Sequence, residues 1–132
     1  MKGIEGMITF CYYNDIEKAA EFYRDTLEFE EVMSKNWVKI YKVGQDSHIG
    51  LVDANMGHLK PASEKPVMLS VYVEDVYAVH KMLDEKGVET NHQPQSSGDL
   101  DMKGFLLEDT EGYVIEFLTF YTKPYGEQNP LG

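Results

Sequence analysis

Two segments of the sequence, sixty positions apart, repeat one pattern of residues. Each begins with an alternating β-type run, reaches an Asp that suits a helix N-cap, and continues as an amphipathic helix. The first segment spans residues 8–27 with Asp15 as the cap, and the second spans residues 68–86 with Asp75 as the cap. Gly87 follows the second helix, where glycine commonly ends one. This repeat predicts a chain built from two copies of one module.

Each predicted helix is followed by two short β-rich segments that a turn connects. These are residues 37–43 and 48–53 in the first copy, and residues 104–108 and 113–120 in the second. The pattern predicts an α+β fold of two βαβββ modules, with each helix covering one face of a sheet. Between the second helix and its hairpin lies the polar segment 91–103, which contains Pro94 and Gly98. We interpret it as an exposed connection, with a mobile lid as the alternative.

The length of 132 residues is typical of one domain. We expect a single domain over residues 1–122, with module one at about 5–56, a linker at about 57–66 and module two at about 67–122. The tail, residues 123–132, contains two prolines and two glycines and is expected to have little structure of its own.

Cys11 is the single cysteine, so no internal disulfide forms, and we interpret it as a small buried hydrophobe rather than a nucleophile.

The negative net charge argues against nucleic acid and anionic lipid as partners. The chain has 23 acidic residues and 12 basic ones, so its surface field repels both kinds of molecule. No apolar run reaches the roughly 18 residues of a membrane helix, and the first 13 residues lack the pattern of a signal peptide. We therefore expect no nucleic-acid partner, no membrane and a cytoplasmic location. An acidic ligand would need a local cation inside a pocket.

Two stretches carry a family resemblance. Residues 15–29 contain an Asp cap, then Phe22-Tyr23, then Leu27-Glu28-Phe29; residues 109–117 read Asp-Thr-Glu-Gly-Tyr-Val-Ile-Glu-Phe. Together they resemble the signatures of the vicinal oxygen chelate superfamily, the glyoxalase, bleomycin-resistance and extradiol-dioxygenase group. Glu28 stands where that family usually has Gly, and Thr110 where Pro is common. The resemblance implies a curved mixed sheet around a cleft, and a homodimer.

The same resemblance implies a divalent metal held by four strand positions, which enzymes of the superfamily fill with His, Glu or Gln. Here the four positions fall on Ile8, Gly50, Met68 and Glu116. Only Glu116 carries a suitable donor, and one carboxylate cannot make a closed metal site. We therefore expect neither a metal nor another cofactor.

Strand alternation predicts which side chains line the cleft. We expect an aromatic and Met-rich surface with a few polar groups, suited to a small and partly apolar ligand. The predicted ligand-binding residues are Phe10, Tyr12, Trp37, Lys39, Tyr41, His48, Met68, Ser70, Tyr72 and Glu116. The alternative is that these aromatic residues are only core, or are covered by a dimer partner.

Glu116 has two interpretations. It either pairs with Lys39 as a buried ion pair, or it is a general base desolvated among aromatic residues. Our first functional hypothesis is a metal-independent small-molecule-binding protein of the bleomycin-resistance type. The second is an enzyme of the superfamily, of lyase, isomerase or dioxygenase type, in which Glu116 is the general base or a metal ligand. A third is a domain that acts through protein contacts.

Overall fold

The computed structural model describes residues 1–124, apart from the side chain of Ser97. The predicted unstructured tail therefore lies, from residue 125 onward, outside the described residues. The chain divides into two compact units, one within Met1–Ser63 and one beginning at Glu64. Each unit contains one module.

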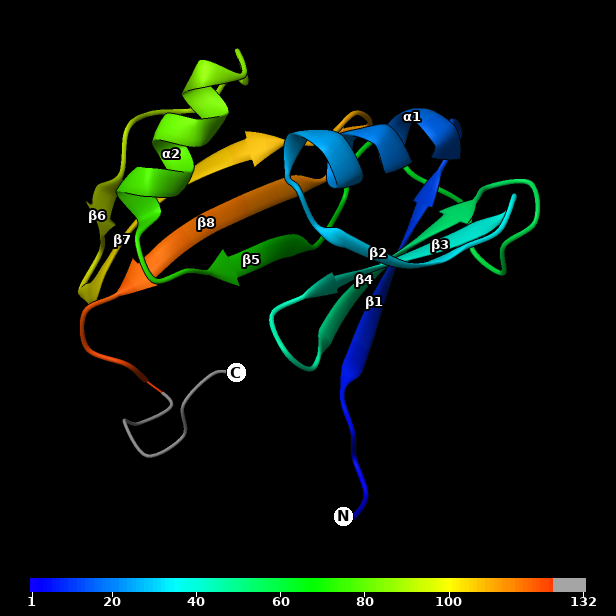
Figure 1. Cartoon of the computed structure of the whole chain (residues 1–132), viewed down its shortest axis with the longest axis horizontal. Coiled ribbons are helices and arrows are strands. Elements are labelled where there is room, and N and C mark those ends of the chain that lie inside the picture. Colours follow the sequence, from blue (N-terminus) through cyan, green and yellow to red (C-terminus); the bar gives the residue numbers. More distant parts are fainter. Residues whose placement is uncertain (125–132) are drawn as a thin grey trace. The chain divides into compact units, whose positions relative to one another are not determined.

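Module one contains a single helix-covered sheet (Figure 1). Its strands lie in the order β1-β4-β3-β2, with β1 parallel to β4 and the other pairs antiparallel. Its elements are β1 (Met7–Tyr13), α1 (Ile16–Glu21), a π-helical segment η1 (Phe22–Thr26), β2 (Glu30–Ser34), β3 (Val38–Val43) and β4 (Ser47–Asp53).

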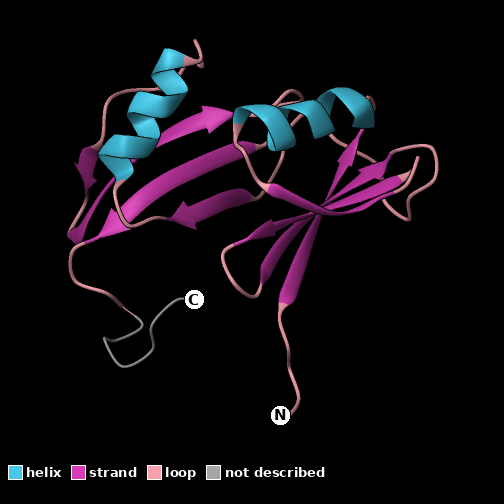
Figure 2. Ribbon diagram, viewed as in Figure 1, coloured by secondary structure: helices cyan, strands magenta, loops and turns pink. Residues whose placement is uncertain are grey.

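Module two repeats this arrangement. Its strands lie in the order β5-β8-β7-β6, again with the first pair parallel and the others antiparallel. Its elements are β5 (Met68–Tyr72), α2 (Val76–Glu85), β6 (Gln95–Ser97), β7 (Leu100–Glu108) and β8 (Val114–Phe120). Figure 2 shows helix and strands together in each module, with the helices in cyan and the strands in magenta. The predicted α+β fold of two βαβββ modules is confirmed.

The predicted caps explain where the helices begin. The Asp15 carboxylate accepts a hydrogen bond from the Lys18 amide, and the Asp75 carboxylate accepts hydrogen bonds from the amides of Tyr77 and Ala78. Gly87, with φ of 77°, follows the end of α2 as expected. Within residues 1–124, no helix has the length and apolar content to cross a bilayer.

Each helix packs on one face of its own sheet, and this side forms the core. In module one the buried side chains under the helix include a group of three tyrosines, Tyr13, Tyr23 and Tyr41. The hydroxyls of Tyr13 and Tyr23 lie 3.1 Å apart, and the rings of Tyr23 and Tyr41 are in contact. Cys11 is buried on this same side of β1, consistent with its interpretation as a small hydrophobe. In module two the core includes Val76, Leu83, Phe105, Ile115 and Phe117.

The interpretation of residues 91–103 as a loop is wrong. This segment contains all of β6 and the start of β7, which begins at Leu100 rather than Gly104. β2 in module one was likewise not located from the sequence. Both β2 and β6 are edge strands, and an edge strand needs few apolar residues because one side of its backbone faces no neighbour.

Candidate functional site

The face of each sheet opposite its helix, here called the open face, carries most of the predicted site residues. In module one, residues paired across strands form three rows, since directly opposed residues point to the same side. The rows are Ile8–His48–Lys42, Phe10–Gly50–Ile40 and Tyr12–Val52–Val38. The side chains of Ile8 and Phe10 are 40% and 44% exposed, whereas Cys11 and Tyr13 on the other side of β1 are buried. The predicted orientation of β1 is therefore correct.

Gly50 forms a notch in the middle row, and the ring of Phe10 fills it. A Cβ atom built on Gly50 would overlap the Cδ1 and Cε1 atoms of that ring. Gly50 is one of the four positions at which the family resemblance places a metal ligand. The space that a ligand side chain would need is thus taken by an aromatic ring.

The loop after β4 borders the third row. A Cβ on Gly57 would lie 2.6 Å from Tyr12 Cε1 and 2.7 Å from Val52 Cγ1, so the loop backbone rests directly against these side chains. Tyr12 is half-buried and Val52 is buried. Only the first two rows of the module-one open face are therefore accessible to a ligand.

The predicted orientation of β3 is wrong. Tyr41 is buried, and its hydroxyl contacts the carbonyl of Ala20 on α1 at 3.4 Å and the Glu31 carboxylate at 3.3 Å. Burial, with the nearby Glu31 charge, raises the pKa of Tyr41 well above its usual value. Tyr41 therefore belongs to the core under α1 and does not line the open face.

Lys39 lies on the same helix side and is also buried. Its ammonium donates to Ser34 Oγ at 2.9 Å and to the Lys35 carbonyl at 3.2 Å, and it lies 3.4 Å from the Glu17 carboxylate on α1. These groups satisfy the charge inside module one. Trp37, expected to line the cleft with Lys39, precedes β3 and is 44% exposed.

In module two the corresponding rows are Met68–Val114–Glu108, Ser70–Glu116–Leu106 and Tyr72–Leu118–Gly104. Met68, Ser70 and Tyr72 are exposed, and Leu69 between them is buried, so the predicted orientation of β5 is correct. The ring of Tyr72 packs near that of Phe120, with 6.2 Å between the two ring centroids.

Glu116 lies half-buried in the middle row and has Ser70 as its partner. The Ser70 hydroxyl donates to Glu116 Oε1 at 2.8 Å. The expected ion pair between Glu116 and Lys39 is wrong, since Lys39 is held by Ser34, Lys35 and Glu17. The Ser70 hydroxyl contacts Oε1, and a carboxylate has more acceptor sites than one donor fills, so Glu116 keeps acceptor capacity toward a ligand.

The residues at the four metal-ligand positions do not fit a metal. Ile8 and Met68 have no coordinating atom that suits a hard or borderline cation, and Gly50 has its side-chain space filled by Phe10. Across residues 1–124, no group of three or more His, Cys, Asp or Glu side chains is arranged to hold a metal ion.

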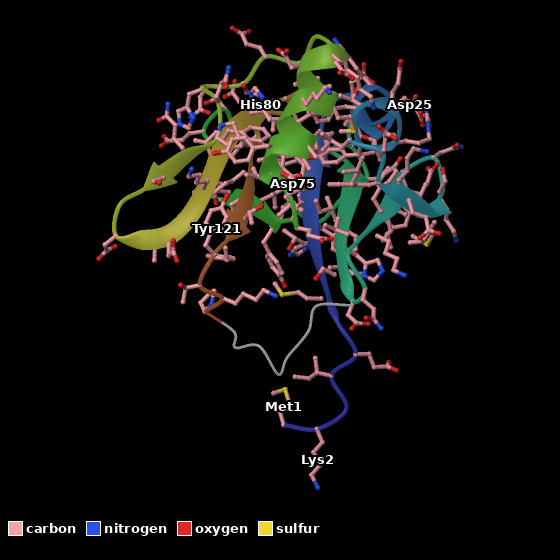
Figure 3. The ribbon with its side chains drawn as sticks, turned by 60° about the vertical axis from the view of Figure 1, so that its left-hand side comes forward. Met1, Lys2, Asp25, Asp75, His80 and Tyr121 are labelled. Atoms are coloured by element: carbon pink, nitrogen blue, oxygen red, sulfur yellow. The ribbon has the colours of Figure 1, made fainter. Side chains whose placement is uncertain are left out.

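The other histidines have local roles. His80 on α2 (Figure 3) contacts Thr90 Oγ1 at 3.1 Å and meets the Phe105 ring edge-on. His92 Nδ1 lies 2.6 Å from the Gln93 carbonyl, and His58 is exposed. Among the histidines, only His48 lies on an open-face row.

A hollow of about 650 Å³ lies in module two beside the strand ends. Its lining residues are Val88, Glu89, Thr90, Asn91, Leu106, Leu107, Glu108, Asp109 and Val114. None of the predicted ligand-binding side chains lines it. Asp109 there accepts hydrogen bonds from the amides of Glu111 and Tyr113 and so serves the β7–β8 turn.

Comparison of the sequence with known protein families identifies the family of this chain. The sequence profile of the Glyoxalase/Bleomycin resistance protein/Dioxygenase superfamily matches residues 8–117. The chain belongs to this superfamily. No curated protein matches the chain at a significant level.

Solved structures share the superfamily fold. A glyoxalase/bleomycin resistance protein/dioxygenase from Nocardioides is 17% identical with a TM-score of 0.72, covering 100% of this chain and 91% of that chain. Lactoylglutathione lyase from Agrobacterium tumefaciens is 18% identical with a TM-score of 0.70, covering 86% and 91%. An integron cassette protein from V. cholerae is 20% identical with a TM-score of 0.71, covering 92% and 98%. At such low identity these likenesses show the fold alone.

Sequence reasoning missed Lys42 as a polar residue of the module-one open face. Lys42 lies opposite His48 in the first row of module one. Alternation alone places Lys42 with Val38 and Ile40, so assigning the wrong face to β3 hid it. The signal that could have found it was the short turn after Val43, which sets Lys42 against His48 in the hairpin.

Proposed function

We propose that this superfamily member is a metal-independent binding protein for a small, partly aromatic or apolar molecule, which lies against the open face of a sheet. The observation that carries the proposal is the chemistry at the metal-ligand positions. Apolar or absent side chains stand at three of the four, and an aromatic ring fills the space at Gly50. Such a surface offers stacking and burial rather than metal coordination.

The exposure of these side chains supports the proposal. Phe10 is 44% exposed, Met68 50% and Tyr72 44%, on the sides of their strands that turn away from the helices. Large apolar side chains exposed on the open face of a sheet commonly mark a binding surface. Ser70 and Glu116 add a hydrogen-bonding pair that can orient a ligand.

The test is a binding titration with a neutral flat probe, 2-naphthalenemethanol, followed by amide chemical shifts of the labelled protein. We expect shifts at open-face residues, and we expect Phe10→Ala to weaken binding while the exposed-aromatic control Tyr121→Ala does not. Binding should be the same with and without a chelator. Absence of binding, or binding that needs added metal, would refute the proposal.

A second candidate is an enzyme in which Glu116 acts as a general base. The hydrogen bond from Ser70 fixes the carboxylate and supports this candidate. Its test is hydrogen–deuterium exchange at the α-carbon of an aryl ketone, acetophenone, in the presence of the protein. Exchange that Glu116→Gln abolishes would establish the enzyme, and exchange equal to that of buffer would exclude this reaction.

We also propose a homodimer, as the family resemblance predicts. The exposed apolar residues of the open faces are consistent with a partner that covers part of them. Analytical ultracentrifugation tests it, since a dimer has twice the chain mass of 15.1 kDa. Sedimentation as a monomer at all concentrations would reject the dimer. The expected cytoplasmic location, and the expected absence of nucleic-acid and membrane partners, stay predictions.

A further inference from the structure

The first row of the module-one open face carries two basic side chains side by side. His48 on β4 and Lys42 on β3 are directly opposed in the antiparallel hairpin, and both are half-buried. Opposed residues of such a pair have Cβ atoms about 4.5–5.5 Å apart. The two nitrogen-bearing side chains can therefore reach one small group between them.

Neither side chain has a protein partner in the part of the chain that the structure describes. Within residues 1–124, no ion pair and no side-chain hydrogen bond involves Lys42 or His48. The nearest acid in the same row is Glu30, opposite Lys42 on the edge strand β2. It forms no ion pair with Lys42.

This placement is unusual for the chain. The formal net charge is −11, so basic side chains are scarce, and two of them stand together on a mainly apolar face. An anion bound between them would accept a charge-assisted hydrogen bond from the Lys42 ammonium and a hydrogen bond from a ring nitrogen of His48.

The other module lacks this feature. The equivalent row of module two holds Met68, Val114 and Glu108, so an apolar residue stands where module one has His48, and an acid stands where it has Lys42. The two copies share the fold but differ in charge at this row. The difference assigns anion recognition to module one.

The next row supplies an aromatic platform. The Phe10 ring lies over Gly50 with Ile40 beside it, one row from His48 and Lys42. Residues two apart on a strand are about 6.6–6.8 Å apart. The long side chain of Lys42 can bridge the remaining distance to an acidic group on a ring that lies against Phe10.

We propose that the module-one open face binds an aromatic molecule that carries one anionic group, with its ring against Phe10 and Gly50 and its acid between Lys42 and His48. This inference rests on the proposed binding function and names the class of its ligand.

The test compares 2-naphthoate with neutral 2-naphthalenemethanol in amide chemical-shift titrations. We expect naphthoate to bind more tightly and to shift the amides of Lys42, His48 and Gly50. Lys42→Gln and His48→Gln should each weaken naphthoate about five- to tenfold and leave the neutral probe unchanged. Lys42→Arg should retain binding, and Lys81→Gln, on the exposed surface of α2, is the matched control.

The outcomes separate the two proposals. If both probes bind equally and the basic variants change neither, or if naphthoate shifts only module-two amides, the anion site is wrong and the binding function stands. If neither probe binds, both proposals fail. Lys42→Arg keeps the test valid should Lys42→Gln fold poorly, because loss of naphthoate binding in a folded Arg variant also counts against the site.

Discussion

The contact between Phe10 and Gly50 can be tested by a double-mutant cycle. In the wild-type protein, Gly50→Ala adds a methyl group where the Phe10 ring lies. The ring is 44% exposed, so it can swing outward, and the cost falls in the lower part of the 1–3 kcal/mol range for overpacking. We expect Gly50→Ala to lower the free energy of unfolding by about 1–1.5 kcal/mol.

The sign should reverse once the ring is removed. In the Phe10→Ala background no ring remains to collide with the new Cβ, since the three nearest atoms around it all belong to Phe10. Alanine is also better than glycine inside a strand, by about 0.5–1 kcal/mol. Gly50→Ala should then stabilise the protein by about 0.5 kcal/mol, which gives a coupling energy of about 1.5–2 kcal/mol.

The assay is urea unfolding of the wild type, the two single variants and the double variant. Ile8→Ala serves as the matched control, because Ile8 lies on the same face of β1 with a similar exposure of 40%, whereas the three atoms nearest a Cβ on Gly50 all belong to Phe10. The cycle with Ile8 should be additive. An additive cycle with Phe10, or destabilisation by Gly50→Ala in both backgrounds, would refute the idea that Phe10 fills the ligand position.

Three further variants test other parts of the account. Glu28 has φ of 60°, so Glu28→Gly should stabilise the protein by about 0.5–1 kcal/mol and Glu28→Ala should not; equal gains in urea unfolding would contradict this. The raised pKa of Tyr41 means that the unfolded chain loses this phenolic proton first, so stability should fall as pH rises above about 10. Tyr41→Phe should reduce that fall above about pH 10, and an identical fall in urea unfolding would be evidence against it. Ser70→Ala should cost about 0.5–1 kcal/mol in the wild type and nothing in Glu116→Ala, whereas equal costs would mean that their hydrogen bond contributes nothing.

The duplicated architecture and the helix starts were predictable because their signals are local. An Asp at an N-cap accepts amide hydrogen bonds from residues two or three positions ahead, and this was found at Asp15 and Asp75. The orientations of β1 and β5 also followed from alternation, since apolar residues such as Leu69 and Val71 suit the side under a helix.

The orientation of β3 could not be read in this way. Val38 and Ile40 are more apolar than Lys39 and Tyr41, yet the latter pair lies under α1. Their apolar stems pack in the core, and their polar tips find partners that only the folded chain supplies, such as the Ala20 carbonyl for Tyr41. Tertiary hydrogen bonds of this kind cannot be predicted from the alternation of apolar and polar residues within one strand.

The departures from the family signatures were visible in the sequence, but their physical meaning was not. Glu28 was recognisable as a replacement for glycine, and the structure adds that it keeps a positive φ. Gly50 was recognisable as a lost metal ligand, and the structure adds that Phe10 occupies its space. The backbone angle of Glu28 and the ring that lies over Gly50 are both properties of the folded chain.

The most direct test of metal-independent binding is elemental analysis combined with a titration of the purified protein. After dialysis against a chelator, we predict well under one equivalent of Fe, Mn, Ni or Zn per chain. The affinity for 2-naphthalenemethanol should be unchanged before chelation, after chelation and after each metal is added back. A near-stoichiometric metal that survives dialysis, or binding that disappears on chelation and returns with metal, would contradict the account.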